Sequence, residues 1–408
     1  MPELTAPHPA EEFDPIGGAM AALVDGLRAD RSGEVAGYIP ELASVDPEPF
    51  GVAVVSVRGR IHAAGDAAVP FTIQSVSKPF VYALALSQTG LDEVSRHVGF
   101  EPSGEPFNAI SLEPDTGRPD NPLINAGAIV TSALVEGTSA ADRFERIRGF
   151  LSACAARDLD VDDDVFASEA RTGDRNRALA HLARSGGVLR GSVDDATEVY
   201  FRQCSIVVST IDVAVMAATL ANGGVNPITH ERVMDERVAT TALAVMATCG
   251  MYDRSGEWMA RVGLPAKSGV GGGIAAVQPA EFGIGVFSPR LDRWGNSVRG
   301  SALLHTLSSQ FDLHVFDHPE APRSPIVSWD TDGSHAHAVL RGELDLISAE
   351  EIVDRLLDTA AAGVGRIDLD VTGVTRSRLV AERLLAAATE RLADAGVEVA
   401  LEGDLRPA

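Results

Sequence analysis

Lysine is almost absent from this chain of 408 residues, which carries only Lys78 and Lys267 against 32 arginines. A chain that uses arginine for nearly every surface cation keeps lysine where a guanidinium does not serve, because only lysine can lose its proton at a reachable pKa when it is desolvated. Codon bias with chance is the alternative explanation for either lysine alone. The two lysines are the first candidates for functional residues.

Cysteine is also scarce. Cys154, Cys204 and Cys249 are odd in number and widely spaced, which fits neither a disulfide framework nor a tetrahedral zinc site. The ten histidines show no ligand spacing, and the acidic run at 160–164 lacks the glycine and the spacing of an EF-hand loop. We therefore expect no metal and no other cofactor.

Positive charge is in short supply, since 34 basic residues face 58 acidic ones and leave a net charge of −24. Such a surface repels phosphate backbones and anionic membranes, so we expect no nucleic acid partner and no membrane association. No segment approaches the roughly 18 uninterrupted apolar residues of a membrane span. Residues 1–15 lack the basic flank and apolar stretch of a signal peptide, so we expect a cytoplasmic protein.

The length and the 45% apolar fraction predict two or three domains, each with its own core. Residues 1–15 are predicted to be a flexible tail, and the prolines of residues 314–325 indicate a linker. Residues 16–313 are predicted to form one α+β domain whose sheet is built from both ends of the domain. Its expected elements are a helix at 16–28, a hairpin at 51–57 and 61–64, a helix at 76–90, a mostly helical region at 91–260 with polar loops at 101–108, 115–121 and 171–177, strands at 266–270, 273–278 and 281–287, and a helix at 298–312.

The sequence pattern of residues 326–408 differs from that of residues 16–313, because short strands alternate with helices. Strands are expected at 336–341, 366–371 and 397–401, and helices at 348–362 and 379–395. The pattern predicts a second, small α/β domain.

The first lysine belongs to a Ser-x-x-Lys motif, Ser75 to Lys78, at the point where a loop enters a helix. Positions i and i+3 share a helix face, so the two side chains are expected within hydrogen-bond reach. A desolvated lysine can act as a base for the serine hydroxyl, and the helix N-terminus stabilises negative charge that develops near Ser75. The alternative is an ordinary surface helix start.

The second lysine opens Lys-Ser-Gly at 267–269, on an expected strand that runs into glycines. An exposed N–H there can donate to a forming oxyanion, whereas the alternative is a glycine-rich hairpin with a solvated lysine. Together the two motifs resemble the layout of the penicillin-recognising serine enzymes, which implies acyl transfer through a serine ester.

A more extensive resemblance covers roughly residues 17–312. The matching blocks lie in order at 37–43, 71–80, 101–108, 121–128, 172–180, 200–205, 250–253 and 267–273. Together they resemble the serine-dependent glutaminases. The resemblance implies a β-lactamase-like fold, the hydrolysis of L-glutamine to L-glutamate and ammonia, and a homo-oligomer, either dimer or tetramer.

The resemblance also implies the roles of individual residues. Ser75 corresponds to the nucleophile, Lys78 to the general base, and the N–H groups of Ser75 and Val270 to the oxyanion hole, while Tyr252 is placed to relay a proton to ammonia. The residues implied to bind substrate are Tyr38, Gln74, Ser75, Asn125, Glu169, Asn176, Tyr200, Tyr252 and Val270. A carboxylate such as Glu169 suits the α-ammonium of glutamine, and amides and phenols suit its α-carboxylate. Taken singly, each residue also has a purely structural explanation.

The C-terminal domain resembles STAS domains through residues 340–345 and 368–374. Members of that family that act as phosphorylation switches carry an Asp-Ser pair, whereas Arg378 and Leu379 stand at the matching positions here and Ser377 is the nearest hydroxyl. The sequence therefore argues against such a switch, and the domain is expected to bind a protein or a small ligand.

Two other functions remain open at the level of sequence. One is a penicillin-interacting acyltransferase, which normally works outside the membrane. The other is a catalytically silent binding protein in which the C-terminal domain is the functional part. Both lysines and the candidate substrate residues favour the enzyme, through a Ser-Lys acyl-enzyme mechanism.

Overall fold

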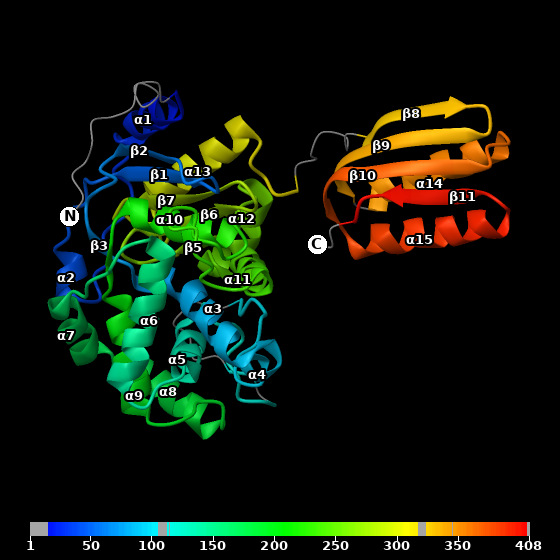
Figure 1. The fold of residues 1–408 in the computed structure, drawn as a ribbon. Coiled ribbons are helices and arrows are strands. Elements are labelled where there is room, and N and C mark those ends of the chain that lie inside the picture. Colours follow the sequence, from blue (N-terminus) through cyan, green and yellow to red (C-terminus); the bar gives the residue numbers. More distant parts are fainter. Residues whose placement is uncertain (1–14, 105–111, 114, 317–323, 345, 406–408) are drawn as a thin grey trace. The chain divides into compact units, whose positions relative to one another are not determined.

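The computed structural model describes residues 15–104, 112–113, 115–316, 324–344 and 346–405 (Figure 1). The chain divides into two compact units, Met1–Asp317 and His318–Ala408. Both units combine helices with a sheet.

The first unit is built on a five-stranded antiparallel sheet of order β2-β1-β7-β6-β5. Strand β1 pairs with β2 on one side and with β7 on the other, so segments more than 200 residues apart lie side by side. The expected sheet made from both ends of the domain is confirmed. Its strands are β1 (Gly51–Ser56), β2 (Ile61–Gly65), β5 (Ala266–Ser268), β6 (Gly273–Gln278) and β7 (Phe282–Phe287).

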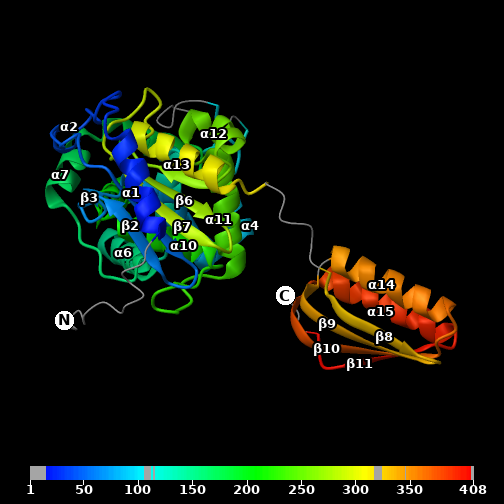
Figure 2. The same ribbon diagram turned by 90° about the horizontal axis from the view of Figure 1, so that it is seen from above.

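Helices cover both faces of this sheet (Figures 1 and 2). On one face, α1 (Pro15–Leu27) and α13 (Val298–Phe311) pack over a buried cluster that includes Val52, Ile274 and Ile284. On the other face, α10 (Thr210–Ala221) packs against β1, β6 and β7. The alternation of side chains along each strand thus feeds two separate cores.

Most of the remaining helices form the large region between β2 and β5, as expected. They begin with the short 3-10 helix η1, which carries Ser75, and surround a core that reaches from Phe80 to Met246. These elements are η1 (Gln74–Ser77), α3 (Lys78–Thr89), α4 (Leu91–Ser95), α5 (Asn125–Leu134), α6 (Ala140–Ala155), α7 (Asp163–Thr172), α8 (Asp174–Ser185), α9 (Val193–Cys204), α11 (Glu236–Cys249), η2 (Tyr252–Arg254) and α12 (Ser255–Arg261). A further short helix, α2 (Pro40–Ala43), precedes β1.

The prediction of a polar loop at 171–177 is wrong. Helix α7 runs to Thr172 and α8 starts at Asp174, so that Gly173 alone separates them. The charged residues that suggested a loop lie on the exposed sides of two helices instead. A two-stranded ribbon of β3 (Phe71–Thr72) and β4 (Val207–Val208) was also missed, because two residues give no periodic pattern. Residues 105–108 of the loop expected at 101–108 lie outside the described residues.

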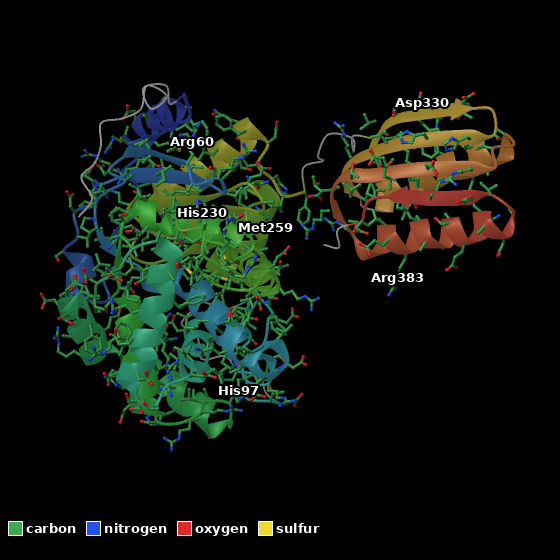
Figure 3. All side chains as sticks on the ribbon, viewed as in Figure 1. Arg60, His97, His230, Met259, Asp330 and Arg383 are labelled. Carbon is green, nitrogen blue, oxygen red and sulfur yellow. The ribbon has the colours of Figure 1, made fainter. Side chains whose placement is uncertain are left out.

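The second unit is a four-stranded sheet of order β11-β10-β9-β8, with β9, β10 and β11 parallel and β8 antiparallel. Residues from the sheet and from both helices form one buried cluster. Figure 3 shows the exposed side chains Asp330 on β8 and Arg383 on α15. The elements are β8 (Ile326–Asp332), β9 (His335–Leu344), α14 (Leu346–Ala361), β10 (Arg366–Ser377), α15 (Leu379–Asp394) and β11 (Glu398–Glu402).

Two details of this unit differ from expectation. Strand β8 was not expected, and β10 continues to Ser377 rather than ending at residue 371. The extension is irregular, since the pairing of β10 with β9 shifts register twice between Asp370 and Arg376. Irregular pairing interrupts the alternation from which a strand is recognised.

None of the helices in the described residues is both long enough and apolar enough to span a membrane.

Candidate active site

Ser75 lies in the turn that leads into a buried helix. It sits in η1, directly before Lys78 begins α3, and the Lys78 N–H donates to the Ser75 carbonyl. Side chains at i and i+3 of a 3-10 helix eclipse each other, so Ser75 and Lys78 project from the same side. Both residues are buried, which shields a reaction at this hydroxyl from bulk water.

The amine of Lys78 is held inside the protein by two oxygen acceptors. Its Nζ donates to Asn125 Oδ1 at 2.7 Å and to the Leu123 carbonyl at 3.3 Å. Burial lowers the pKa of the amine from 10.5 to about 8, although nearby Cys204 and Glu169 act in the opposite direction. A neutral amine has two N–H groups and one lone pair, so these two acceptors leave the lone pair available as a base.

Asn125 connects Lys78 to two further predicted site residues. Its Oδ1 also accepts from the Tyr200 hydroxyl at 3.2 Å, and its Nδ2 donates to Asn176 Oδ1 at 3.0 Å. The three residues come from the first turns of α5 and α8 and from α9. The network fixes which end of the Asn125 amide faces the amine.

Glu169 is a buried carboxylate that forms no salt bridge with the described residues. It is 4% exposed. Burial raises the pKa of Glu169, while hydrogen bonds from Tyr38 and Gln74 and the nearby Lys78 oppose the rise. The Tyr38 hydroxyl donates to Glu169 Oε1 at 2.8 Å. A buried carboxylate of this kind suits a cationic ligand group.

The backbone around Val270 lies against the turn that carries Ser75. A Cβ added to Gly269 would stand 3.0 Å from Val76 Cγ2, and one added to Gly271 would stand 3.0 Å from the Thr72 carbonyl. The Val270 N–H has no hydrogen-bond partner in the ranges that the structure describes, and N–H groups at the start of a helix such as η1 have no partner within it. The N–H groups of Ser75 and Val270 are thus available as oxyanion donors.

Tyr252 approaches Ser75 from another element, η2. The Tyr252 hydroxyl donates to the Ser268 carbonyl at 2.9 Å. Burial raises the pKa of Tyr252, and the hydrogen bond with the Ser75 side chain opposes that rise. A phenol in contact with the serine oxygen can pass a proton to or from the reacting group.

One cavity of about 230 Å³ brings most of the predicted residues together. Of the predicted substrate-binding set, Tyr252 alone is not part of its wall, and it instead lines a neighbouring hollow of about 330 Å³. The predicted residues in the wall of the smaller cavity are Tyr38, Gln74, Ser75, Asn125, Glu169, Asn176, Tyr200 and Val270.

Three features of the site were not predicted from the sequence. Arg175 lines the same cavity from α8, and it lies within a motif block whose neighbour Asn176 was selected. Cys204 also lines it, but burial raises the pKa of this thiol to about 12, so it stays protonated and is a poor nucleophile. The Leu123 carbonyl that binds Lys78 is a backbone atom and leaves no signal in the sequence.

Two site residues have strained backbones. Gln74 has φ of 48° and Tyr252 has φ of 54°, in the left-handed region that disfavours side chains. Gln74 is supported from behind, since Ser77 Oγ donates to the Gln74 carbonyl and Gln203 donates to Ser77 Oγ. Such strain persists only where the surrounding structure enforces it, which is common at active sites.

In the part of the chain that the structure describes, no group of three or more His, Cys, Asp or Glu side chains is arranged to hold a metal ion.

Comparison with known proteins connects this geometry to one family. The glutaminase family model matches residues 33–316. The chain is 43% identical over 387 residues to a glutaminase of Corynebacterium glutamicum, covering 94% of this chain and 93% of that protein. It is 44% identical over 394 residues to glutaminase 1 of Bradyrhizobium diazoefficiens, where the alignment covers 92% of this chain and 64% of the relative.

The similarity extends to three dimensions. A crystal structure of Mglu matches with a TM-score of 0.87 at 43% sequence identity, covering 97% of this chain and 100% of that chain. The match therefore includes residues of both units.

Proposed function

Because this chain belongs to the glutaminase family of hydrolases, we propose that it hydrolyses L-glutamine to L-glutamate and ammonia through a covalent acyl-enzyme formed on Ser75. The observation that carries the proposal is a single cavity in which a buried serine hydroxyl and the buried Glu169 carboxylate face the same small volume. A substrate with an amide at one end and an ammonium at the other matches both groups.

Acylation begins with removal of the Ser75 proton. The neutral Lys78 amine takes that proton while Ser75 Oγ attacks the side-chain carboxamide carbon of glutamine. The carbonyl oxygen becomes an oxyanion that the N–H groups of Ser75 and Val270 stabilise. Orientation of the amine by Asn125 Oδ1 and the Leu123 carbonyl supports this role.

Collapse of the tetrahedral intermediate breaks the carbon–nitrogen bond. The departing nitrogen receives a proton through the Tyr252 hydroxyl and leaves as ammonia, and Lys78 returns the proton taken from Ser75 to that relay. Water then attacks the ester, with Lys78 again taking the proton. Glutamate leaves, and the Ser75 hydroxyl is restored.

Recognition of the α-amino acid end follows from the charges around the cavity. The Glu169 carboxylate, which has no cationic partner among the described residues, pairs with the α-ammonium. Asn125, Asn176 and Tyr200 line the same cavity, and their amide and phenol groups are the partners that suit the α-carboxylate. No metal and no other cofactor takes part in this scheme.

Three assays test the proposal, each with wild type and with Ser75→Ala. They measure ammonia release from glutamine, ammonia release from asparagine, and hydrolysis of a chromogenic β-lactam. We expect ammonia from glutamine at a rate that Ser75→Ala reduces by about 10⁴-fold or more without loss of fold. Mass spectrometry after a rapid acid quench should detect wild type carrying a glutamyl ester. A fully active Ser75→Ala variant, or turnover of the β-lactam alone, would refute the assignment.

For the second unit we propose a STAS-like module that binds a protein or a small ligand. The support is a mixed sheet of four strands with two helices packed into its core. Ser377, the nearest candidate for phosphorylation, is fully buried at the end of β10 and hydrogen-bonds to Glu382. This burial disfavours a phosphorylation switch at Ser377, in agreement with the missing Asp-Ser pair.

A further inference from the structure

The second lysine is as deeply buried as the first but does not reach the substrate cavity. Lys267 is 0% exposed and lies on β5, outside the wall of the cavity that contains Ser75. Its Nζ donates to the Gly250 carbonyl at 3.0 Å and to the Ser268 carbonyl at 2.5 Å. No salt bridge to Lys267 occurs within the described ranges. Burying an amine costs desolvation free energy, and charge pairing does not offset that cost here. The position of Lys267 therefore calls for another explanation.

Lys267 and Tyr252 share an acceptor and touch each other. The Ser268 carbonyl accepts both from Lys267 Nζ and from the Tyr252 hydroxyl, which lies 2.9 Å away. The amine also lies 4.1 Å from the centroid of the Tyr252 ring. A carbonyl oxygen has two lone pairs, so each donor occupies one, and the phenol O–H is directed away from Ser75 while its oxygen faces the nucleophile.

The loop that carries Tyr252 depends on β5 for its shape. A Cβ added to Gly250 would stand only 1.7 Å from the Ala266 carbonyl, so the loop and the strand are in direct backbone contact. Tyr252 itself has the left-handed φ of 54°. Lys267 binds the carbonyl two residues before Tyr252 and the ring of Tyr252 at once, which restrains both the backbone and the side chain.

We propose that Lys267 is a positioning residue for the hydrolysis proposed above: by holding the Gly250 and Ser268 carbonyls and the Tyr252 ring, it keeps the Tyr252 hydroxyl at Ser75. It acts on the reaction only through Tyr252 and makes no contact with substrate. The inference rests on the proposed function, because a phenol at Ser75 matters only if Ser75 reacts.

The chemistry of the amine explains why this position is lysine in a chain that otherwise uses arginine. Burial and the nearby Lys78 lower the pKa of Lys267 well below its ordinary value. Hydrogen bonds to the two carbonyls survive the loss of charge from the amine, whereas a guanidinium at this buried position would stay charged.

A double-mutant cycle tests the inference. Lys267→Met in the wild-type background is expected to lower kcat for glutamine at least tenfold and to leave KM within about threefold, since no substrate contact is lost. In the Tyr252→Phe background, where the hydroxyl is already absent, the same substitution should change kcat less than about twofold. Melting temperatures and near-ultraviolet circular dichroism establish that each variant is folded.

Ser255→Ala provides a matched control. Ser255 braces the same loop from the other side, because its Oγ accepts from the Met251 N–H and donates to the Tyr252 carbonyl. These two hydrogen bonds hold only the backbone of the loop and involve neither Ser268 nor Lys267, so Ser255→Ala should couple to Tyr252→Phe more weakly than Lys267→Met does. Coupling of Ser255→Ala to Tyr252→Phe as strong as that of Lys267→Met would overturn the assignment to Lys267.

The remaining outcomes also decide the question. Losses from Lys267→Met and Tyr252→Phe that multiply, or wild-type kcat in Lys267→Met, would overturn the inference. If Lys267→Met does not fold, Lys267→Gln is measured in the same cycle and judged by the same two results. Failure of the proposed function is distinguishable, because it would appear as a wild type without glutaminase activity or as an active Ser75→Ala variant.

Discussion

The protonation state of Lys78 controls the proposed activity more directly than that of any other residue of the proposed site. The amine is buried, its two N–H groups are engaged by Asn125 and Leu123, and its pKa falls to about 8. The lone pair needed for catalysis is present only in the neutral form. In the proposed mechanism, activity at neutral pH therefore depends on how far burial has lowered the pKa of Lys78.

The pH dependence of kcat/KM follows from that value. Below pH 8 the protonated fraction of Lys78 increases, so kcat/KM should fall about tenfold for each unit of decreasing pH, and it should level off above pH 8. Steady-state rates of ammonia release between pH 6 and 9 measure this profile. Lys78→Arg should be inactive throughout, because arginine keeps its proton. A flat profile, or an active Lys78→Arg variant, would contradict a neutral lysine base.

Glu169 is predicted to decide affinity for the amino acid end of the substrate. Glu169→Gln retains the size of the side chain and an acceptor for Tyr38 but removes the charge that pairs with the α-ammonium. Loss of a buried charge pair costs about 3 kcal/mol, so kcat/KM should drop roughly 100-fold, mostly through KM. Glu198→Gln is the matched control, because the Glu198 carboxylate pairs with Arg202 on the partly exposed side of α9. Equal kinetics in the two variants would contradict the assignment.

The same substitution should stabilise the protein. The pKa of Glu169 is raised in the folded state, so the folded protein binds the proton more tightly than the unfolded chain does. Stability from this group is therefore lost as the pH rises above the unfolded value of 4.5. Glu169→Gln should melt at a higher temperature than wild type at pH 7, with a smaller difference near pH 4 in scanning calorimetry. A melting temperature of Glu169→Gln below that of wild type at pH 7 would contradict the idea that Glu169 serves binding at the expense of stability.

Among the elements, the junction of α7 and α8 has the clearest link to the site. Glu169 stands near the end of α7 and Asn176 in the first turn of α8, and Gly173 joins them. A Cβ on Gly173 would lie 2.3 Å from Phe201 Cζ and 2.6 Å from the Glu169 carbonyl. The glycine therefore lets the two helices that carry Glu169 and Asn176 to the cavity wall meet against α9.

Gly173→Ala should separate these helices. Overpacking of this kind costs about 1–3 kcal/mol, and we expect a lower melting temperature together with a higher KM for glutamine. Gly149→Ala is the control, since Gly149 lies within α6 with nothing within 4 Å of an added Cβ. That control should stabilise the protein by about 0.5–1 kcal/mol and leave kinetics unchanged. A Gly173→Ala variant that behaves like the control would show that the junction tolerates a methyl group.

The elements that could be predicted from the sequence are those with a clear period or a clear stop. The hairpin of β1 and β2, the strands β6 and β7 and the helix ending at Gly90 belong to this group. Strand β8 could not be predicted, because it follows a proline-rich stretch and ends in Asp330, Thr331 and Asp332, whose side chains are largely solvent-accessible. The junction at Gly173 escaped prediction because its charged residues face solvent.

The candidate site was predictable only in part for a similar reason. Side chains such as Ser75 and Lys78 are visible as a motif, and the resemblance supplied the rest of the cavity wall. Backbone groups leave no such signal, so the Leu123 and Ser268 carbonyls that orient Lys78 and Tyr252 appeared only in three dimensions. The packing of Lys267 on Tyr252 joins two distant segments and was equally hidden.

At the scale of the whole molecule, the two units have separate cores. The cluster around Leu340 and Leu369 contains only residues of the second unit, and the cavity around Ser75 is lined only by residues of the first. The glutaminase family model likewise ends at residue 316. Each unit therefore meets the basic condition for independent folding.

Truncation after Asp317 should leave the catalytic unit intact. We expect kcat and KM for glutamine within about twofold of the full chain, because none of the residues proposed to bind substrate is removed. Calorimetry should show the loss of one unfolding transition and retention of the other. A truncated chain that is folded but at least tenfold less active would show instead that the second unit acts on the active site.

Burial of both lysines has a practical consequence for handling this protein. Reagents that acylate or condense with primary amines, such as succinimidyl esters and glutaraldehyde, meet no lysine side chain at the surface, since Lys78 is 1% and Lys267 0% exposed. Fluorescent tagging, bead immobilisation or cross-linking is better directed to the abundant surface carboxylates. Slow amine modification during partial denaturation would, conversely, report that the interior had opened.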